Sequence, residues 1–252
     1  MSTLLLRLAA PLQSWGVASK FDTRDTAREP TKSGVIGLLA AALGRSRTES
    51  LDELKELYFG VRIDQPGILL RDYHTAQQKR KGASFVTTRY YLADAVFLVG
   101  LEGEAKFLQK LAVALRNPVF PLYLGRRSCP PEGKLVLGLR NLSLQQALIK
   151  ERWLASEWYQ NKLKRELKWQ QDKENKQQNK QLEPIKLTIV CDAQPNAPGA
   201  FLRRDLPVSF DQRHRQYAFR MVIDTADAVT ILTPQPTAEL PTEHDAMAGW
   251  GD

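Results

Sequence analysis

The sequence predicts an α+β protein with a ferredoxin-like, RRM-like core, and the order of its elements is the reason. In the first half of the chain, strand patterns occur at 3–10, 61–75, 90–103 and 134–142. Helical patterns occur at 35–43, 50–60 and 104–118. If the helix over 50–60 is an addition, this order reduces to βαββαβ. Many RNA-binding modules share that fold, but so do many proteins that bind no RNA.

The first strand and the helix after it have the clearest patterns. Along the strand, Leu4, Leu6 and Leu8 face one way and Leu5, Arg7 and Ala9 the other. Pro11 is expected to end this strand. An apolar, buried helix should run from Val35 to Leu43, with Ser33 as its N-cap and Gly44 just past its end. Its free N–H groups, together with Lys32, would form an anion site.

The next elements lead into a polar, basic loop. Residues 50–60 fit an amphipathic helix, with Ser50 and Glu53 as a capping box. Residues 61–75 fit two strands about a Pro-Gly turn. The stretch 76–88 is polar and basic, and it separates these strands from the strong strand at 90–103.

Composition divides the chain into three regions. Residues 1–142 hold the ferredoxin-like unit. Residues 143–184 are rich in Lys, Gln and Trp and should form one long helix or two in tandem, with Trp153 and Trp158 packed on the body. Residues 185–252 hold two further strands, an arginine-rich segment between them and a Pro-rich tail, which together predict a small C-terminal β region.

Charge and cysteine content narrow the functional classes. The formal net charge is +8 and the pI about 9.5, which favours an anionic partner such as nucleic acid over a basic surface that serves only solubility. Two cysteines are too few for a disulfide framework and lack zinc-site spacing. No segment resembles a signal peptide or a membrane span, so we expect a cytoplasmic protein without membrane contact.

Catalytic and metal-binding patterns are weak. The three histidines have no His or Cys neighbour at metal-ligand spacing, and the acids are not clustered as two-metal nuclease chemistry requires. We therefore expect neither a metal nor a cofactor. His74, in the sequence RDYHT, could act as a general base on RNA, although such a histidine more often packs or forms hydrogen bonds.

Basic residues beside aromatic ones are the stronger signal. Residues 121–131, PLYLGRRSCPP, place two arginines after a glycine in a loop stiffened by prolines. Arg71 and Tyr73 could clamp a phosphate and stack on a base. Gln13 could recognise a base edge and Trp15 could stack, although a Trp after a first strand is more often a core residue.

Together these segments resemble a known family. The stretches LRLAAPLQSWG (6–16), PTKSGVIGLLAAALG (30–44), LLRDYHT (69–75), PLYLGRRSCPP (121–131) and RRDLPVSFDQRHRQYAFRMV (203–222) are similar to the CasD subunits of type I-E CRISPR Cascade complexes. These belong to the Cas-five family of the RAMP superfamily. The resemblance extends from residue 1 to about residue 225.

The resemblance implies a fold and a role. Family members have a ferredoxin-like RAMP domain with a β-hairpin thumb, here at about 76–88, and a smaller C-terminal β region. They cap the 5′ handle of the CRISPR RNA and contact the large subunit and the adjacent backbone subunit. In type I-E a separate endonuclease processes the RNA, whereas a type I-C relative cuts RNA itself. The stretch 150–183 and the tail after about 230 depart from the family pattern, and either could contact a neighbour or target DNA.

Three hypotheses follow. The first is a non-catalytic subunit, not a homo-oligomer, that holds the CRISPR RNA 5′ handle and joins the large subunit to the backbone filament for antiviral DNA targeting. The second is a metal-independent CRISPR-repeat endoribonuclease with His74 as general base. The third is a generic basic RNA-binding protein that works alone.

Under the first hypothesis, arginines and Lys32 would neutralise phosphates, aromatic rings would stack, and glycines would let backbone N–H groups approach the RNA. The expected RNA-binding residues are Gln13, Trp15, Lys32, Ser33, Gly34, Arg71, Tyr73, His74, Tyr123, Leu124, Gly125, Arg126, Arg127, Ser128 and Arg204. Of Arg126 and Arg127, one is expected to contact RNA and the other to tie the loop to the body.

Overall fold

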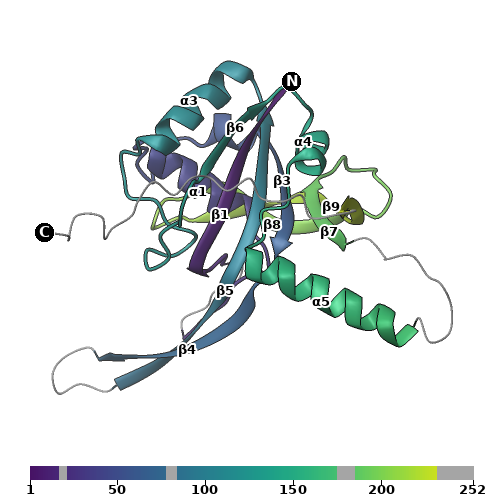
Figure 1. The fold of residues 1–252 in the computed structure, drawn as a ribbon. Coiled ribbons are helices and arrows are strands. Elements are labelled where there is room, and N and C mark those ends of the chain that lie inside the picture. Colours follow the sequence, from purple (N-terminus) through teal and green to yellow (C-terminus); the bar gives the residue numbers. More distant parts are fainter. Residues whose placement is uncertain (17–21, 78–83, 175–184, 232–252) are drawn as a thin grey trace, which may run out of the picture.

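The computed structural model describes residues 1–16, 22–77, 84–174 and 185–231. Its elements are β1 (Ser2–Gln13), β2 (Thr23–Arg24), α1 (Lys32–Ala42), α2 (Asp52–Lys55), β3 (Tyr58–Gln65), β4 (Ile68–Gln77), β5 (Ser84–Gly103), α3 (Ala105–Arg116), β6 (Val136–Arg140), α4 (Leu144–Lys150), α5 (Glu157–Glu174), β7 (Ile185–Asp192), β8 (Phe201–Ser209) and β9 (Gln216–Ile231). Figure 1 shows the sheet crossing the molecule, with helices on both of its sides. No helix in these ranges is long and apolar enough to cross a membrane.

One sheet connects all the strands of the described residues. Its order is β6-β1-β5-β3-β7-β9-β8, and β2 and β4 pair with β5 outside this path. The pairs among β6, β1, β5 and β3 are all antiparallel. The C-terminal strands continue the same sheet, because β7 pairs with β3 at Gly60–Cys191, Val61–Val190 and Arg62–Ile189.

The core has two layers, one on each face of the sheet. Leu4, Leu6 and Leu8 pack with α1 and α3, whereas Leu5 and Ala9 pack with α4 on the other face. The predicted alternation of the first strand is therefore confirmed. Pro11 does not end this strand. The ladder with β5 pairs Ala10 with Ala95 and Leu12 with Ala93 but skips Pro11, so the ring displaces no ladder bond.

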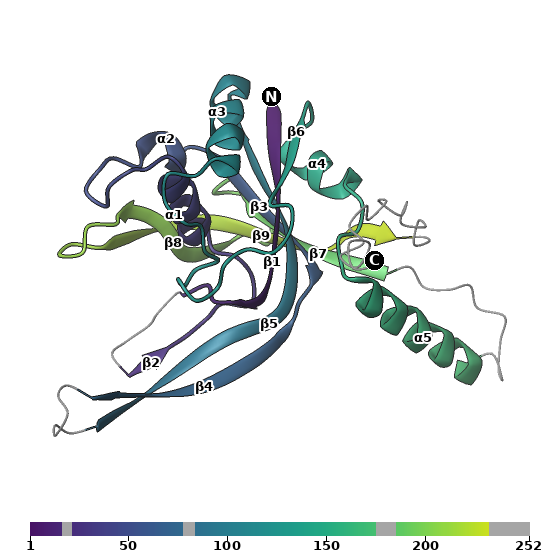
Figure 2. The ribbon, with the colours of Figure 1, turned by 60° about the vertical axis from the view of Figure 1, so that its left-hand side comes forward.

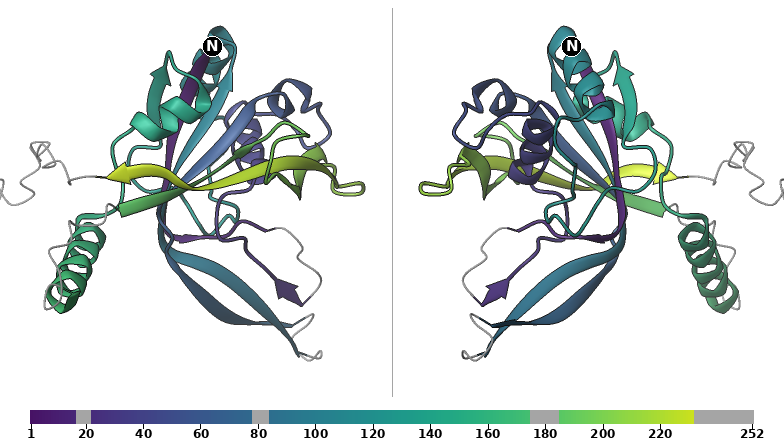
Figure 3. Two further views of the ribbon diagram at one scale, coloured as in Figure 1. Left: turned by 90° about the vertical axis from the view of Figure 1, so that its right-hand side faces the viewer. Right: turned by 90° about the vertical axis from the view of Figure 1, so that its left-hand side faces the viewer.

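Strand β5 belongs to both the body and a projecting arm. Its C-terminal half pairs with β1 and β3, and its N-terminal half pairs with β4 from Ser84 to Ala93. Figures 2 and 3 show this β4–β5 arm extending away from the body. The hairpin thus begins at Ile68, earlier than the predicted thumb at 76–88, whose residues 78–83 lie outside the described ranges.

A turn at Pro66 and Gly67 lets the chain pass from β3 to β4. Gly67 has φ +69°, and a Cβ there would lie 2.6 Å from the Ala93 carbonyl oxygen. Gln65 Nε2 donates to the carbonyl of Asp94, itself at φ 56°, over 2.6 Å. The predicted Pro-Gly turn is confirmed, but β3 and β4 both pair with β5 and not with each other.

One predicted helix differs in the structure, and another region resolves a choice that the sequence left open. The helix expected over 50–60 is short, because α2 ends at Lys55 and Tyr58 already belongs to β3. Its capping box does not form, since Asp52 N–H donates to the Ser50 hydroxyl and Glu53 instead pairs with Arg45. Within the described part of the next region, residues 143–174, two helices form in tandem, α4 and α5, and α5 projects from the body in all three ribbon views.

Candidate functional site: an arginine-lined pocket beside the loop at 121–131

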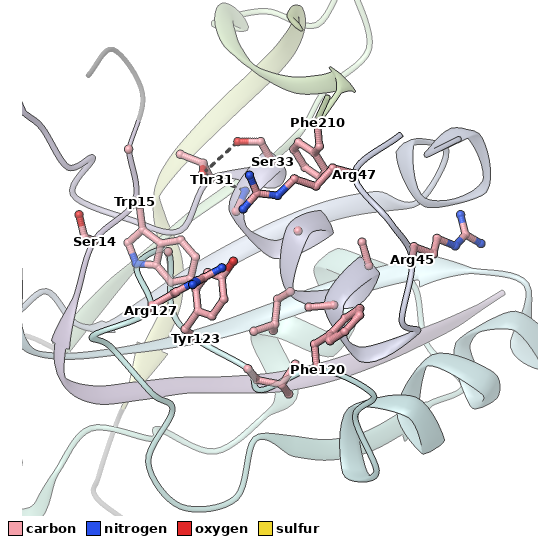
Figure 4. Close-up of a pocket in the computed structure, with 18 of the residues that line it drawn as sticks. Ser14, Trp15, Thr31, Ser33, Arg45, Arg47, Phe120, Tyr123, Arg127 and Phe210 are labelled. Carbon is pink, nitrogen blue, oxygen red and sulfur yellow. Dashed lines mark hydrogen bonds between the residues drawn. The ribbon is translucent and has the colours of Figure 1, made fainter. Parts of the chain in front are cut away.

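A pocket of about 980 Å³ lies beside the C-terminal end of β1. Four segments enclose it: residues 14–16 after β1, α1 with the residues after it, the loop that contains PLYLGRRSCPP, and the turn between β8 and β9. Figure 4 shows side chains from all four around the opening. Aromatic rings on its wall come from Trp15, Phe120, Tyr123, Phe210 and Tyr217.

Positive charge lines this pocket. Among the described residues that form the wall, the charged ones are all arginines: Arg45, Arg47, Arg127 and Arg215. Arg45 is engaged elsewhere, since its Nη2 lies 2.6 Å from Glu53 Oε2 and its guanidinium points away from the pocket in Figure 4. Arg47 turns toward the pocket in the same view. A cavity with cations and aromatic rings suits an anion that carries flat rings, as a nucleotide does.

The loop of the pocket is held by its backbone. Ser14 N–H donates to Leu124 O over 3.1 Å, and Leu124 N–H donates to Cys129 O over 2.7 Å. Gly125 has φ +86°, and a Cβ there would lie 1.6 Å from Ser14 O. Glycine is therefore required for the loop to approach β1, and Leu124 is buried as the anchor of the loop.

The two adjacent arginines have different surroundings. Arg126 Nη2 donates to the carbonyl of Arg24 over 2.8 Å, and its Cζ lies 4.6 Å from the centroid of the Tyr91 ring. Arg126 thus ties the loop to the body. Arg127 is exposed and lines the pocket, so it is the arginine of the pair that a ligand could reach. Ser128 is exposed beside it.

The start of α1 is not an open anion site. Thr31, not Ser33, is the N-cap, and its hydroxyl accepts from Gly34 N–H over 3.2 Å. The N–H of Lys32 donates to Asp205 Oδ2 over 2.9 Å. A carboxylate of the protein therefore occupies the position that was predicted for a phosphate.

Lys32 itself belongs to a buried ionic cluster. Its Nζ lies 2.9 Å from Asp192 Oδ2, and Arg220 contacts both Asp192 and Asp205. Burial lowers the pKa of Lys32, while the neighbouring Asp192 opposes that shift. The prediction that Lys32 neutralises an RNA phosphate is wrong for this conformation, because its ammonium is buried and already paired.

Two more predicted contact residues are interior. Gln13 is fully buried: its Nε2 donates to the carbonyls of Leu8 and Ala95, and its Oε1 accepts from Trp15 Nε1. It cannot meet a base edge without breaking these bonds. Trp15 is 1% exposed and forms a pocket wall rather than an open stacking surface.

Ser33 and Gly34 have structural roles beside Trp15. The Ser33 hydroxyl donates to Thr31 Oγ1 over 3.3 Å. A Cβ on Gly34 would lie 2.7 Å from Trp15 Cε3, so this glycine allows α1 to pack on the indole. Both residues also line the pocket.

The remaining predicted residues lie on the arm and on an edge strand. Arg71, Tyr73 and His74 are exposed on β4, and Arg71 Cζ lies 4.4 Å from the Tyr73 ring centroid. His74 Nδ1 lies 3.9 Å from Asp72 Oδ2. Arg204 is on β8, where its Nε donates to Tyr217 O over 3.4 Å. None of these four lines the pocket, whereas Tyr123 does.

Sequence reasoning missed several pocket residues. Arg45, Arg47, Phe120, Phe210 and Arg215 were not singled out, because only the three-dimensional fold brings the residues after α1, the loop at 120–130 and the β8–β9 turn around one cavity. The arginine-rich segment between the last two strands was the available signal for Arg215. No group of three or more His, Cys, Asp or Glu side chains in the described ranges could hold a metal ion.

Comparisons with known proteins agree with this architecture. The model of the family described as CRISPR-associated protein (Cas_Cas5) matches residues 3–223. A curated relative, the CRISPR system Cascade subunit CasD of Escherichia coli (strain K12), is 42% identical over 171 residues, which are 59% of this chain and 76% of the relative.

Two solved structures resemble most of the chain. One, described as a CRISPR RNA-guided surveillance complex, has a TM-score of 0.73 and 31% identity, and the match covers 93% of this chain and 95% of that one. The other, described as the crystal structure of a Cas protein, has a TM-score of 0.65 and 38% identity over 92% of this chain and 100% of that one. The chain therefore belongs to the Cas5 family of CRISPR-associated proteins.

Proposed function

We propose that the chain is the non-catalytic, RNA-binding subunit of a type I-E CRISPR Cascade surveillance complex. It holds the 5′ handle of the CRISPR RNA and joins the large subunit to the backbone filament for antiviral DNA targeting in the cytoplasm. Membership of the Cas5 family and likeness to a CasD subunit and to a surveillance complex support the assignment to such a complex.

The arginine-lined pocket is the observation that supports handle binding. Arg47, Arg127 and Arg215 surround a cavity with aromatic walls, and proteins that bind single-stranded RNA combine cations for phosphates with rings for bases. The pocket lies at the end of β1, and the β4–β5 arm leaves the same sheet. A strand of RNA bound in the pocket could continue along the arm, where Arg71 and Tyr73 are exposed.

We also propose that the body is a ferredoxin-like RAMP domain. The support is the antiparallel order β6-β1-β5-β3, formed by the fourth, first, third and second strands of the predicted βαββαβ unit. The projecting β4–β5 hairpin would then be the thumb.

Handle binding can be tested with the double variant Arg47→Ala/Arg127→Ala. We expect weaker binding of handle RNA and a slope of log K against log salt that is shallower by about 0.7 for each lost phosphate contact. Arg152→Ala, which removes another exposed arginine outside the pocket, is the matched control. Binding of handle RNA that is equal in all three proteins, measured by fluorescence anisotropy, would refute the pocket as the handle site.

The competing hypothesis is the endoribonuclease with His74 as base. Asp72 lies beside His74, but 3.9 Å is beyond hydrogen-bond distance and both side chains are about half exposed. Incubation of the chain with labelled repeat RNA in EDTA should leave the RNA intact. Cleavage that His74→Ala abolishes would establish the nuclease and overturn the non-catalytic assignment.

A further inference from the structure

Helix α5 presents an exposed face of mixed aromatic and cationic side chains. Trp158, Lys162, Arg165 and Trp169 are spaced at i, i+4, i+7 and i+11, so they share one side of the helix. All four are exposed, Trp158 by 49% and Trp169 by 61%. The two tryptophans lie about 16 Å apart along the axis, at 1.5 Å rise per residue. We call these four residues the tryptophan face.

Other sides of the helix are less exposed. Tyr159, Gln160 and Leu163 lie away from the tryptophan face and are each only partly exposed. The two tryptophans are therefore among the more exposed side chains of the helix. Exposed tryptophans are uncommon on a soluble protein, and a pair of them on one face indicates a binding surface.

The segment just before α5 is fixed to the body by hydrogen bonds, so the tryptophan face has a defined position. Arg62, which is fully buried, donates to the carbonyls of Leu148, Glu151 and Arg152 over 2.6 Å each. Gln65 Oε1 accepts from both the N–H and the hydroxyl of Ser156, directly before the helix.

Contacts between aromatic rings connect this anchored segment to Trp158. Trp153 Nε1 donates to Asp64 O over 2.9 Å, and the Trp153 and Tyr159 rings meet edge to face at 6.4 Å. Tyr159 then meets Trp158 edge to face at 5.7 Å. The Trp158 ring is thereby oriented before any ligand arrives.

We propose that the tryptophan face of α5 is a second nucleic-acid contact, one that binds an unpaired strand. Trp158 and Trp169 would stack on bases, while Lys162 and Arg165 between them would meet the phosphates. Stacking of this kind requires a base whose face is open, which a single strand offers and a duplex does not. This inference does not depend on the pocket or on the handle RNA.

The arrangement of the face argues against other ligands. A helix that docks in a protein groove carries aliphatic anchors at i, i+3, i+4 and i+7, but here the positions between the tryptophans are cations. A helix that lies on a membrane places its cations opposite its apolar residues, whereas Lys162 and Arg165 share the side of the tryptophans. Lys162 has Glu166 Oε1 at 3.9 Å, an exposed pair that a phosphate could displace.

The test uses the full chain in the Arg47→Ala/Arg127→Ala background, so that binding at the pocket is reduced in every sample. Homopolymeric single-stranded DNA, homopolymeric RNA and duplex DNA are titrated, with fluorescence anisotropy as the readout. We expect both single strands to bind more tightly than the duplex, and the tighter of the two identifies the natural ligand as DNA or RNA.

Variants of α5 then locate the contact. Trp158→Ala/Trp169→Ala should weaken single-strand binding by about tenfold or more, and Trp158→Phe/Trp169→Phe should retain most of it, because phenyl rings also stack. Lys162→Ala should reduce the salt slope by about 0.7, whereas Lys164→Ala, an exposed cation on another side of the same helix, should not. Thermal melting should be the same in all of them.

Three results would overturn the proposal. The first is single-strand affinity that the double alanine variant leaves unchanged. The second is duplex affinity equal to that for the single strands. The third is loss of co-purifying subunits by the double alanine variant while its oligonucleotide binding stays intact, which would make α5 a protein contact.

Discussion

At Gly125 one hydrogen atom in place of a methyl group determines the shape of the pocket loop. Its φ of +86° is strained for other residues, and a Cβ would lie 1.6 Å from Ser14 O, a backbone atom that cannot move away cheaply. We expect Gly125→Ala to lower the free energy of unfolding by several kcal/mol, or to displace the loop.

Gly199 provides a matched control for this substitution. Its φ is +78°, but a Cβ there would meet nothing within 4 Å. Gly199→Ala should therefore cost only about 1–2 kcal/mol, from backbone strain alone. Urea denaturation of both variants measures the difference, and equal losses would mean that the contact with Ser14 is not the constraint.

Asp192 joins two buried cations, so its loss should be costly. It pairs with Lys32 and Arg220 and accepts from Phe59 N–H over 2.9 Å. We expect Asp192→Ala to destabilise the protein by about 3–5 kcal/mol, because the Lys32 ammonium would stay buried without its nearest partner.

The control for Asp192 is Asp52, whose carboxylate is exposed in its pair with Lys55. Its side chain is 74% exposed, so water screens the charges and the pair contributes little to stability. If Asp192→Ala and Asp52→Ala shift the urea midpoint equally, water must reach the cluster and the burial described above would be wrong.

Residue types alone could not show which side chains would contact a ligand and which would bind other residues inside the protein. Gln13, Trp15 and Lys32 have the side chains that an RNA site needs, yet all three are buried and satisfied by neighbours. Which polar group finds a partner depends on elements far away in sequence, such as Asp192 for Lys32. The loop at 121–131 could be singled out because its Gly, Arg and Pro pattern is local, and in the structure this loop lines the pocket.

At the scale of elements, local sequence patterns predicted helices such as α1. They failed where pairing with a distant strand determines the structure. Helix α1 follows from its apolar run and from Gly44, which has φ +74° just past its end. The helix expected over 50–60 was cut short because Tyr58, Phe59 and Gly60 pair with β5. Trp153 packs on the body as predicted, whereas the prediction for Trp158 was wrong: it is half exposed on α5.

The anchorage of α5 can be tested with Gln65→Ala. This change removes both hydrogen bonds that Gln65 Oε1 accepts from Ser156, and it leaves the Ser156 N–H without that acceptor. We expect faster hydrogen exchange of the amides at 154–160 and a loss of about 1–3 kcal/mol in stability.

Gln145→Ala on α4 is the comparison, because Gln145 is exposed. Its exchange over 154–160 should match that of the unmodified chain. Unchanged protection of this segment in Gln65→Ala would show that the Arg62 and Asp64 contacts hold α5 without help from Gln65.

At the scale of the whole molecule, the C-terminal strands belong to the same sheet as the strands of the first half of the chain. Strand β7 pairs with β3, and Ile189 belongs to the same buried cluster as Leu5 and Leu148. Asp205 also accepts the first N–H of α1. The composition boundary near residue 185 thus lies inside one continuous sheet.

A chain truncated after residue 184 should accordingly fail to fold. It would expose the edge of β3 and leave Lys32 without Asp192, so we expect no cooperative thermal transition by circular dichroism and strong binding of a hydrophobic dye. A cooperative melt of the 1–184 fragment would instead show that the first half is an independent domain.

The continuity of β5 limits how the arm can change length. Its register in the body is fixed by β1 and β3, so any insertion must be absorbed beyond Leu92. One residue added to each strand midway along the arm would turn every more distal side chain to the opposite face, whereas two per strand would preserve the faces and extend the reach by about 7 Å. Arms of this kind should therefore vary among relatives in steps of two residues per strand, or at the hairpin tip.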